Sequence, residues 1–513
     1  MLEQWKLVVG PQEQAALSQA SLRVRYGQGK FADEREYPAL DELRPLNLLG
    51  ADLPELFTYT GNGNIVPPPE RYLPRYQVQA ATVLRQVYGA NPFLEEWVAF
   101  WREHFSIYAY DTGVGAFLPH WDRTVIREHC LGNFASLLEA SAQHPSMLYY
   151  LNNRSSRAGS ANENYARELF ELHTLGRAAY LNTLYSHWRK VPGALVADPT
   201  AYIDEDVYEA ARAFTGWTVE DGTGLGGGQS LPKTGRFAYV ESWHDNYQKR
   251  VLAQELTPYA GPMSDGKKVL LICAYHRATA QHLATKLVKR FVSQTAPTDM
   301  VASTARVFYE QRRSPTQLSQ VLEHLRQCAA RLPFAQRQQI RRPASLVAAF
   351  AKAVNLPMSL GEGNILYRIE IAGPPIYGWP SPEGPPVMSD WYLSSSYLRS
   401  RSELLLGLAE NWWGTGEWNP FDQVPERATN IELLARWESA LFGSPRPELS
   451  AAILTALKLR PQDSTTDVKR ARRLVGLLAL SPSFQTEAVL PIASDAALVP
   501  AKVTSPKKRR AQS

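Results

Sequence analysis

Asn162-Glu-Asn-Tyr-Ala-Arg-Glu-Leu-Phe-Glu-Leu-His-Thr-Leu-Gly176 reads as one short amphipathic helix within a predicted helix over 161–175. Ser160 and Glu163 have the spacing of a capping box, and Gly176 is a natural left-handed stop. At roughly 100° per residue, His173 falls on the apolar face. The polar stripe consists of Glu163, Arg167, Glu171 and Thr174, with Asn164 and Glu168 beside it. An inward-facing imidazole needs a polar partner.

A second predicted helix has the same feature. It runs over 91–108, with Asn91 as N-cap and Pro92 at its first position. His104 falls within its apolar, aromatic face. The two histidines are either separate, hydrogen-bonded core residues or parts of one polar pocket. We expect His104 and His173 to lie near each other or to share a partner, with Glu168, Glu171 or Asp245 as the carboxylate.

Helical periodicity dominates the chain, which predicts a mainly α, multi-helix globular protein. Strand-like alternation is confined to Arg236–Val240, and one small β-hairpin is expected near 217–245. Further helices are predicted near 76–88, 120–142, 204–215, 266–274, 277–293, 299–310, 315–330, 343–354, 393–410, 428–441, 447–457 and 466–480.

At 513 residues the chain is long for a single core, which favours several packed parts. We expect an irregular N-terminal extension over 1–75 and a helical core with the signature motifs over 76–335. A C-terminal helical subdomain with a Gly/Pro/Trp-rich loop follows over 336–490, then a disordered basic tail over 491–513.

Composition excludes several classes of protein. The net charge is +5, and much of the excess sits in Lys507-Lys-Arg-Arg510, so no nucleic-acid-binding face is indicated. No run of about 18 apolar residues predicts a membrane span. The first residues lack the pattern of a signal peptide, and the sequence assigns no compartment. Three widely spaced cysteines suggest neither a disulfide framework nor a zinc cluster.

The signature closely resembles that of a large bacterial family catalogued as domain of unknown function 1800. Phe100-Trp-Arg-Glu-His-Phe105 is similar to the family's Phe-Trp-His-x-His-Phe, and further motifs follow in order over roughly 90–490. Arg102 replaces the family's first histidine and projects away from the apolar face. The segment 177–202 stands where many relatives have a short link, and is interpreted as a lid or a surface elaboration. The resemblance implies no established activity. Relatives are often exported and encoded beside a second protein, which implies a protein partner.

Candidate functional residues converge from four segments. The catalytic candidates are His104, Glu168, Glu171, His173, His244 and Asp245, and the ligand-binding candidates are Arg167, Lys286, Arg290 and Trp379. His282, near Lys286, is interpreted as a surface residue. Histidines and carboxylates could hold a divalent metal ion, with His104, His173 and His244 as its ligands, or could perform acid–base work without one.

Two functions remain open at this stage. One is an enzyme of unassigned reaction that uses a buried His/Glu/Asp pocket, with or without a metal. The other is a non-catalytic helical partner or assembly protein whose buried polar network is structural. Convergence of the candidate residues around one cavity would favour the enzyme.

Overall fold

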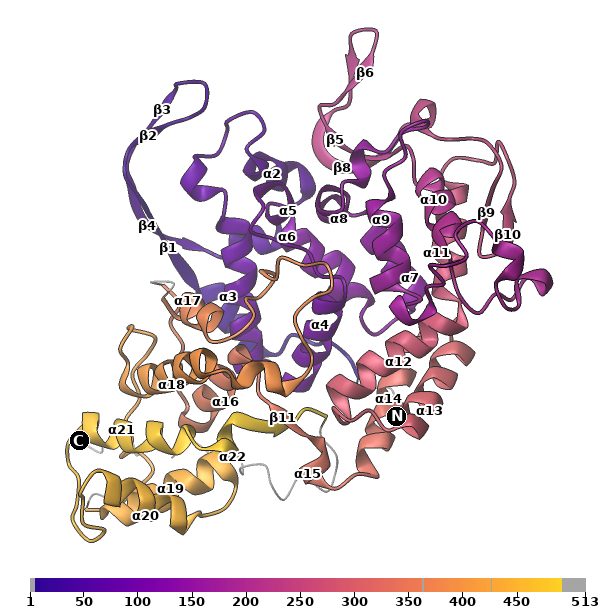
Figure 1. Ribbon diagram of the computed structural model, residues 1–513. Helices are drawn as coiled ribbons and strands as arrows, with labels where there is room; N and C mark the ends of the chain where they lie inside the picture. The colour runs from indigo at the N-terminus through magenta and orange to yellow at the C-terminus, as the bar shows by residue number, and fades with distance from the viewer. Residues whose placement is uncertain (1–4, 362–363, 426, 491–513) are drawn as a thin grey trace.

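Helices form the frame of the molecule, as the periodicity predicts (Figure 1). The structure is a computed structural model that describes residues 5–361, 364–425 and 427–490. The expected tail over 491–513 lies outside the described residues. The helices are α1 (Pro11–Gln19), α2 (Leu53–Phe57), α3 (Leu73–Tyr88), α4 (Pro92–His104), α5 (Thr112–Gly115), α6 (Leu118–His120), α7 (Phe134–Gln143), α8 (Pro145–Tyr150), α9 (Glu163–Glu168), α10 (Asp204–Ala213), α11 (Ser264–Ala274), α12 (Arg277–Phe291), α13 (Thr298–Glu310), α14 (Gln317–Ala330), α15 (Phe334–Arg337), α16 (Pro343–Val354), α17 (Asn364–Ile371), α18 (Ser395–Glu410), α19 (Asn430–Phe442), α20 (Pro447–Ala456), α21 (Val468–Ala479) and α22 (Pro482–Gln485).

Short helical turns of other types join these helices. Two are π-helical: η5 (Trp121–Arg127) and η7 (Leu169–His173). The 3₁₀ turns are η2 (Asn47–Gly50), η3 (Thr58–Thr60), η4 (Pro68–Glu70), η6 (Asn153–Ser155), η8 (Arg177–Ala179), η9 (Trp188–Lys190), η10 (Ala194–Val196), η11 (Glu241–Trp243) and η12 (Ser389–Leu393).

Strands within the described residues form only two-stranded antiparallel sheets, so the mainly α prediction is confirmed. The hairpin expected near 217–245 is β5 (Trp217–Asp221) with β8 (Lys233–Tyr239), extended by β6 (Gly224–Gly226) and β7 (Gln229–Ser230). The other pairs are β1 (Ser21–Tyr26) with β4 (Leu40–Pro45), β2 (Gly29–Lys30) with β3 (Glu36–Tyr37), β9 (Lys249–Val251) with β10 (Gln254–Leu256), and β11 (Gln338–Ile340) with β12 (Thr486–Ala488).

Two local predictions need correction. The stretch before residue 76 contains the β1–β4 ribbon, in which buried Leu22 and Val24 alternate with exposed Arg23 and Arg25. The single helix expected over 120–142 is interrupted after η5. Asn133 begins α7 instead, and its side chain accepts a hydrogen bond from the Ala135 N–H at 2.9 Å. A cap inside a periodic stretch ends one helix and starts the next.

α4 runs through the main core. Trp97 and Trp101 are fully buried, and Trp97 lies 5.1 Å between ring centroids from Phe291 of α12. α3 packs against α16, and β11 pairs with β12 close to the C-terminal end of the described chain. α18 to α22 gather at one end of the molecule, away from the β6–β7 hairpin (Figure 1). Every described helix is too short or too polar to span a bilayer.

The segment 177–202 folds as a surface elaboration with its own small apolar cluster. Val191, Ala194, Ala201 and Ile203 are buried together there. His276 ties the segment to the frame, because its Nε2 donates to the Pro199 carbonyl at 2.7 Å while its Nδ1 accepts from the Ala278 N–H at the start of α12.

Candidate functional site

The signature segment is an α-helix that widens into a π-turn. Asn162, not Ser160, is the N-cap, since its side chain accepts from the Asn164 N–H at 2.9 Å. The α9 helix ends at Glu168, and η7 continues it to His173. At Gly176 the backbone is left-handed, with φ +87°, and its N–H reaches back to the Phe170 carbonyl.

The π-turn changes which side chains face inward. A π-turn holds more residues than an α-helical turn, so the faces predicted with 100° per residue no longer apply beyond Glu168. Thr174, expected on the polar stripe, is fully buried, and its hydroxyl donates to the Leu169 carbonyl. His173 is 1% exposed. Single π-turns within α-helices occur frequently at functional sites.

His104 and His173 meet at the ends of α4 and η7. Their ring centroids are 6.2 Å apart, which confirms that the two inward histidines lie near each other. The pair sits among aromatic side chains: Phe100 stacks on His104, and Phe105 contacts both imidazoles. The convergence follows from the apolar faces of two helices that share one core.

The partner of His104 is a lysine and not the expected carboxylate. Lys286 Nζ lies 3.0 Å from His104 Nδ1, and His104 Nε2 lies 3.1 Å from the His173 carbonyl oxygen. Because a carbonyl only accepts, Nε2 carries the proton and Nδ1 accepts from the lysine. Among the described residues, neither ring nitrogen of His173 has a hydrogen-bond partner.

Burial determines the protonation of this cluster, which we call the lysine–imidazole cluster: His104, His173, His282 and Lys286. Burial, reinforced by Lys286, holds the pKa of His104 well below its usual range and lowers the pKa of His173 to about 3. Burial also lowers the pKa of Lys286 to about 8, against the opposing charges of Glu103 and Glu383. Both imidazoles are therefore neutral at pH 7, and the amine of Lys286 loses its proton near pH 8 instead of near its ordinary pKa.

His282 belongs to this cluster, although it was interpreted as a surface residue. It lies one turn before Lys286 on α12, and its Nε2 donates to the Leu172 carbonyl at 3.1 Å. Burial, with Lys286 next, lowers the pKa of His282 to about 4. A Cβ at residue 176 would come within 2.5 Å of its ring, so Gly176 also allows this close approach. The spacing of four residues between His282 and Lys286 places both on one face of a helix, and this is the sequence signal that indicates their proximity.

An acidic rim adjoins the cluster; we use this name for Glu168, Glu171 and Glu383. Arg177 forms ion pairs with both Glu171 and Glu383. No hydrogen bond to Glu168 occurs in the described part of the chain, and burial followed by the Glu171 charge raises the Glu168 pKa. The charge of Glu383 acts on both Lys286 and Glu168, so it lies within electrostatic reach of both.

Arg167 lies outside this arrangement. It pairs with Glu163 at 3.2 Å and approaches Asp204 at 3.6 Å, and its side chain is 38% exposed. It therefore belongs to a surface ion-pair ladder.

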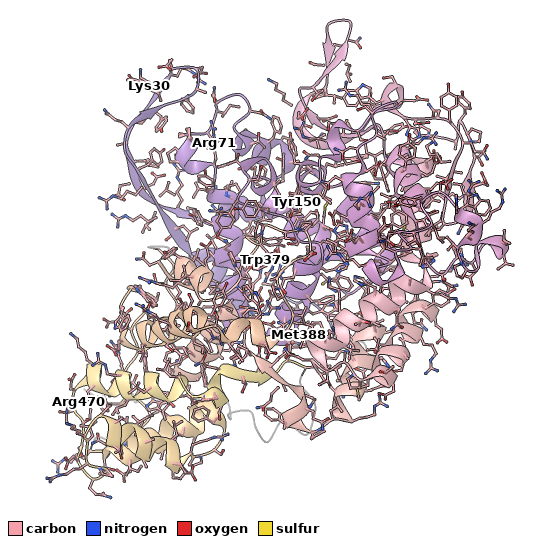
Figure 2. All side chains as sticks on the ribbon, viewed as in Figure 1. Lys30, Arg71, Tyr150, Trp379, Met388 and Arg470 are labelled. Atoms are coloured by element: carbon pink, nitrogen blue, oxygen red, sulfur yellow. The ribbon has the colours of Figure 1, made fainter. Side chains whose placement is uncertain are left out.

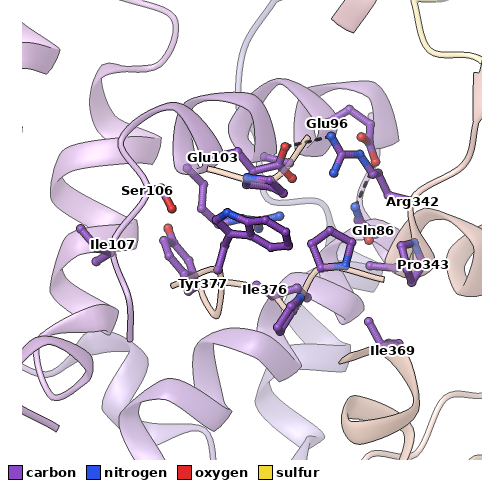
Figure 3. Close-up of a pocket in the computed structure, with 17 residues that line it drawn as sticks. Gln86, Glu96, Glu103, Ser106, Ile107, Arg342, Pro343, Ile369, Ile376 and Tyr377 are labelled. Carbon is purple, nitrogen blue, oxygen red and sulfur yellow. Dashed lines mark hydrogen bonds and ion pairs between the residues drawn. The ribbon is translucent and has the colours of Figure 1, made fainter. Parts of the chain in front are cut away.

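A small cavity of about 40 Å³ lies on the other side of Glu103 (Figure 3). Arg342 Nη2 holds Glu103 at 3.1 Å, and Gln86 donates to Glu96 at 3.2 Å. Arg102, predicted to point outward, is 7% exposed and lines this cavity, because the 372–387 loop covers it. The space is enough for a few water molecules and not for a larger ligand.

Trp379 also lines the cavity and packs edge-on against Trp391, with centroids 5.3 Å apart. Its loop is anchored at two points. The Tyr150 hydroxyl donates to the Pro380 carbonyl at 2.8 Å, and Tyr150 and Trp379 appear near each other in Figure 2. Gly384 lies so close to the Glu103 carbonyl that a Cβ would come within 2.2 Å of it. The loop therefore covers the end of α4 that carries Glu103 and His104.

His244 and Asp245 belong to a different network. His244 Nδ1 donates to the Thr215 carbonyl at 2.8 Å, its Nε2 lies 3.4 Å from Asp265, and Asp245 pairs with Arg212 at 2.8 Å. Each of these groups has a partner of its own. The structure therefore gives no contact between His244 and the lysine–imidazole cluster.

Arg290 is also engaged elsewhere. It is fully buried and forms an ion pair with Glu96, and its carbonyl accepts from Gln339 at 2.7 Å. Across residues 5–361, 364–425 and 427–490, no group of three or more His, Cys, Asp or Glu side chains is arranged to hold a metal ion. The metal site with His104, His173 and His244 remains a prediction without structural support.

Comparison with known proteins identifies the family only. The model of a family described as "Protein of unknown function (DUF1800)" matches residues 14–486. Neither the curated proteins nor the solved structures contain a significant match to this chain.

Proposed function

The chain belongs to the DUF1800 family, whose function is unknown, and we propose that it is an enzyme with a reactive lysine, Lys286, activated by His104. The observation that carries the proposal is the 3.0 Å contact between Lys286 Nζ and His104 Nδ1. A neutral imidazole accepts a hydrogen bond from the amine without adding a charge that would stabilise the ammonium form. Burial lowers the pKa of this amine to about 8, and such an amine can act as a base or nucleophile near neutral pH.

Lys249 gives a comparison within the same protein. Its side chain is fully buried, and Nζ is held by Asp265 at 2.7 Å and by two backbone carbonyls, of Asp245 and Tyr247. Such a set of acceptors is typical of a buried lysine with a structural role. Lys286 has one hydrogen-bond partner among the described residues, His104, and no direct carboxylate. This difference supports a chemical role for Lys286.

The other groups of the site have supporting roles in this proposal. His104 orients the amine, and its own position is fixed by the bond to the His173 carbonyl. Glu168, with a raised pKa and no hydrogen-bond partner in the described chain, is suited to give and take a proton. Glu103 and Glu383 are the charges that limit how far the Lys286 pKa falls.

The proposal is tested with p-nitrophenyl acetate, a small ester that acetylates neutral amines and releases p-nitrophenolate. We expect the acetyl group on Lys286 Nζ, with a rate that rises through about pH 8. The rate for free Nα-acetyl-lysine should rise only near its ordinary pKa of about 10.4. Peptide mass spectrometry identifies the site, and absorbance gives the rate.

Lys286→Met should abolish this modification. Lys352→Met is the matched control, because burial also lowers the Lys352 pKa to about 8 but no histidine contacts it. Acetylation of Lys286 should be unchanged in that variant. If Lys286 in the folded wild type reacts no faster than the free amine at pH 8, the proposal is wrong.

Two observations favour the non-catalytic alternative. Several buried ion pairs, such as Glu96–Arg290 and Glu95–Arg127, are internal to the fold, and the cavity beside Glu103 is small. An unreactive Lys286, together with lower stability of Lys286→Met, would favour this structural role.

A further inference from the structure

The charge around the cluster restricts what Lys286 could meet. Within the described chain, the acidic rim has three carboxylates and only two nearby arginines: Arg177, which is already bound to Glu171 and Glu383, and Arg167, whose charge acts on Glu168. Glu168 has no hydrogen-bond partner among the described residues. A ligand with a carboxylate or phosphate would therefore approach against unbalanced negative charge. A neutral ligand would meet no such opposition.

We infer that Lys286 forms a Schiff base with an aldehyde or ketone that carries no acidic group; this inference rests on the proposed function. The imidazole accepts an N–H of Lys286 and leaves the lone pair of the neutral amine free, and Phe100 and Phe105, packed on His104, make the surroundings of the amine apolar. Amines of this kind attack carbonyl carbon readily when they are neutral.

The reaction balances without an oxidant or a reductant. The lysine nitrogen forms a bond to the carbonyl carbon, and the carbonyl oxygen leaves as water with the two hydrogens that the amine loses. The product is a C=N bond. The departing oxygen takes up a proton from water.

The test compares two aldehydes of two carbons each, acetaldehyde and glyoxylate, which differ in a methyl group against a carboxylate. Cyanoborohydride reduces any Schiff base to a stable secondary amine, ethyl-lysine or carboxymethyl-lysine, which peptide mass spectrometry locates. Each yield is divided by the yield with free Nα-acetyl-lysine, which removes the intrinsic reactivity of the aldehyde. We expect the normalised yield at Lys286 to favour acetaldehyde by about tenfold or more. Repulsion between the acidic rim and the single negative charge of glyoxylate is sufficient for that ratio.

Variants of the rim test the reason for the preference. Glu383→Gln and Glu171→Gln should each raise the glyoxylate yield at Lys286, while Glu417→Gln, at an exposed position elsewhere, should not. Lys286→Arg should give no adduct at residue 286.

The outcomes separate this inference from the proposed function. If p-nitrophenyl acetate acetylates Lys286 but acetaldehyde gives no adduct, the amine is reactive and the carbonyl substrate class is wrong. If glyoxylate reacts as well as acetaldehyde, the exclusion of acidic carbonyl compounds is wrong. If neither reagent modifies Lys286, both proposals fail together.

Discussion

Arg167 and Arg290 pair with glutamates in opposite surroundings. Arg167 is 38% exposed in its ladder with Glu163, whereas Arg290 and its partner Glu96 are buried. We expect Arg167→Ala to lower the free energy of unfolding by less than about 1 kcal/mol. Arg290→Ala should lower it by about 3–5 kcal/mol, because it leaves Glu96 as an unpaired buried charge. Urea unfolding of both variants measures this, and equal costs would contradict the assignment.

His173 should make the protein acid-labile. Its folded pKa is about 3 and its unfolded pKa about 6.5, so the unfolded chain binds the extra proton between these values. Stability contributed by the neutral ring is complete above about pH 6.5 and is lost as pH falls towards 3.

The variant His173→Leu should therefore lose less stability than the wild type between pH 6.5 and 4, by up to about 1.4 kcal/mol per pH unit. Denaturant unfolding at several pH values gives the slopes. His187→Leu, at an exposed position, should keep the wild-type slope. A parallel pH profile for His173→Leu would show that the ring is not held neutral.

At this scale the sequence identifies inward-facing residues better than their partners. His104 and His173 were found because each interrupts an apolar face. The sequence predicts Lys286 only as a ligand-binding residue, because it lies 182 residues from His104 and periodicity carries no information on contacts between distant helices. His244 was grouped with them on residue type alone, and its true neighbours, Thr215 and Asp265, give no spacing signal.

At the scale of elements, the 372–387 loop and the 177–202 segment meet at Arg177. This arginine joins Glu171 of η7 to Glu383 of the loop, and its side chain is 63% exposed. Exposed ion pairs of this kind contribute about 0.2–1 kcal/mol each. If they restrict access to Lys286 by holding the loop against the segment, Arg177→Ala should speed acetylation of Lys286 by about two- to fivefold.

The rate with p-nitrophenyl acetate, followed at Lys286, measures this effect. Arg399→Ala removes another exposed ion pair, on α18, and should leave the rate unchanged. A slower reaction in Arg177→Ala would show that the arginine holds the site together and does not restrict access to it.

Most long helices could be predicted from periodicity, including α12, α13 and α16. The predicted helix over 120–142 failed because its pattern continues through Leu131-Gly132-Asn133, where the chain turns and restarts. The β1–β4 ribbon was missed because its strands have six residues each, too few for alternation to stand out among charged neighbours. Turn chemistry and short strands depend on contacts that a single sequence does not reveal.

At the scale of the whole molecule, the predicted parts over 76–335 and 336–490 share buried contacts. Gln339 bonds to Arg290 of α12, and α16 packs against α3. We therefore expect one cooperative unfolding transition in scanning calorimetry, with equal calorimetric and van't Hoff enthalpies. Two separated transitions would show that the two parts fold independently.

The π-turn at Leu169–His173 has a genetic consequence. A π-turn is equivalent to one extra codon in an α-helix, so the side chains after it are displaced by about 100° from the positions that the first half of the helix would give them. The position of His173 next to His104 thus depends on the number of residues in the segment as well as on which residues they are. An in-frame deletion of a single codon here would keep the composition of the helix nearly intact and yet move His173 away from His104.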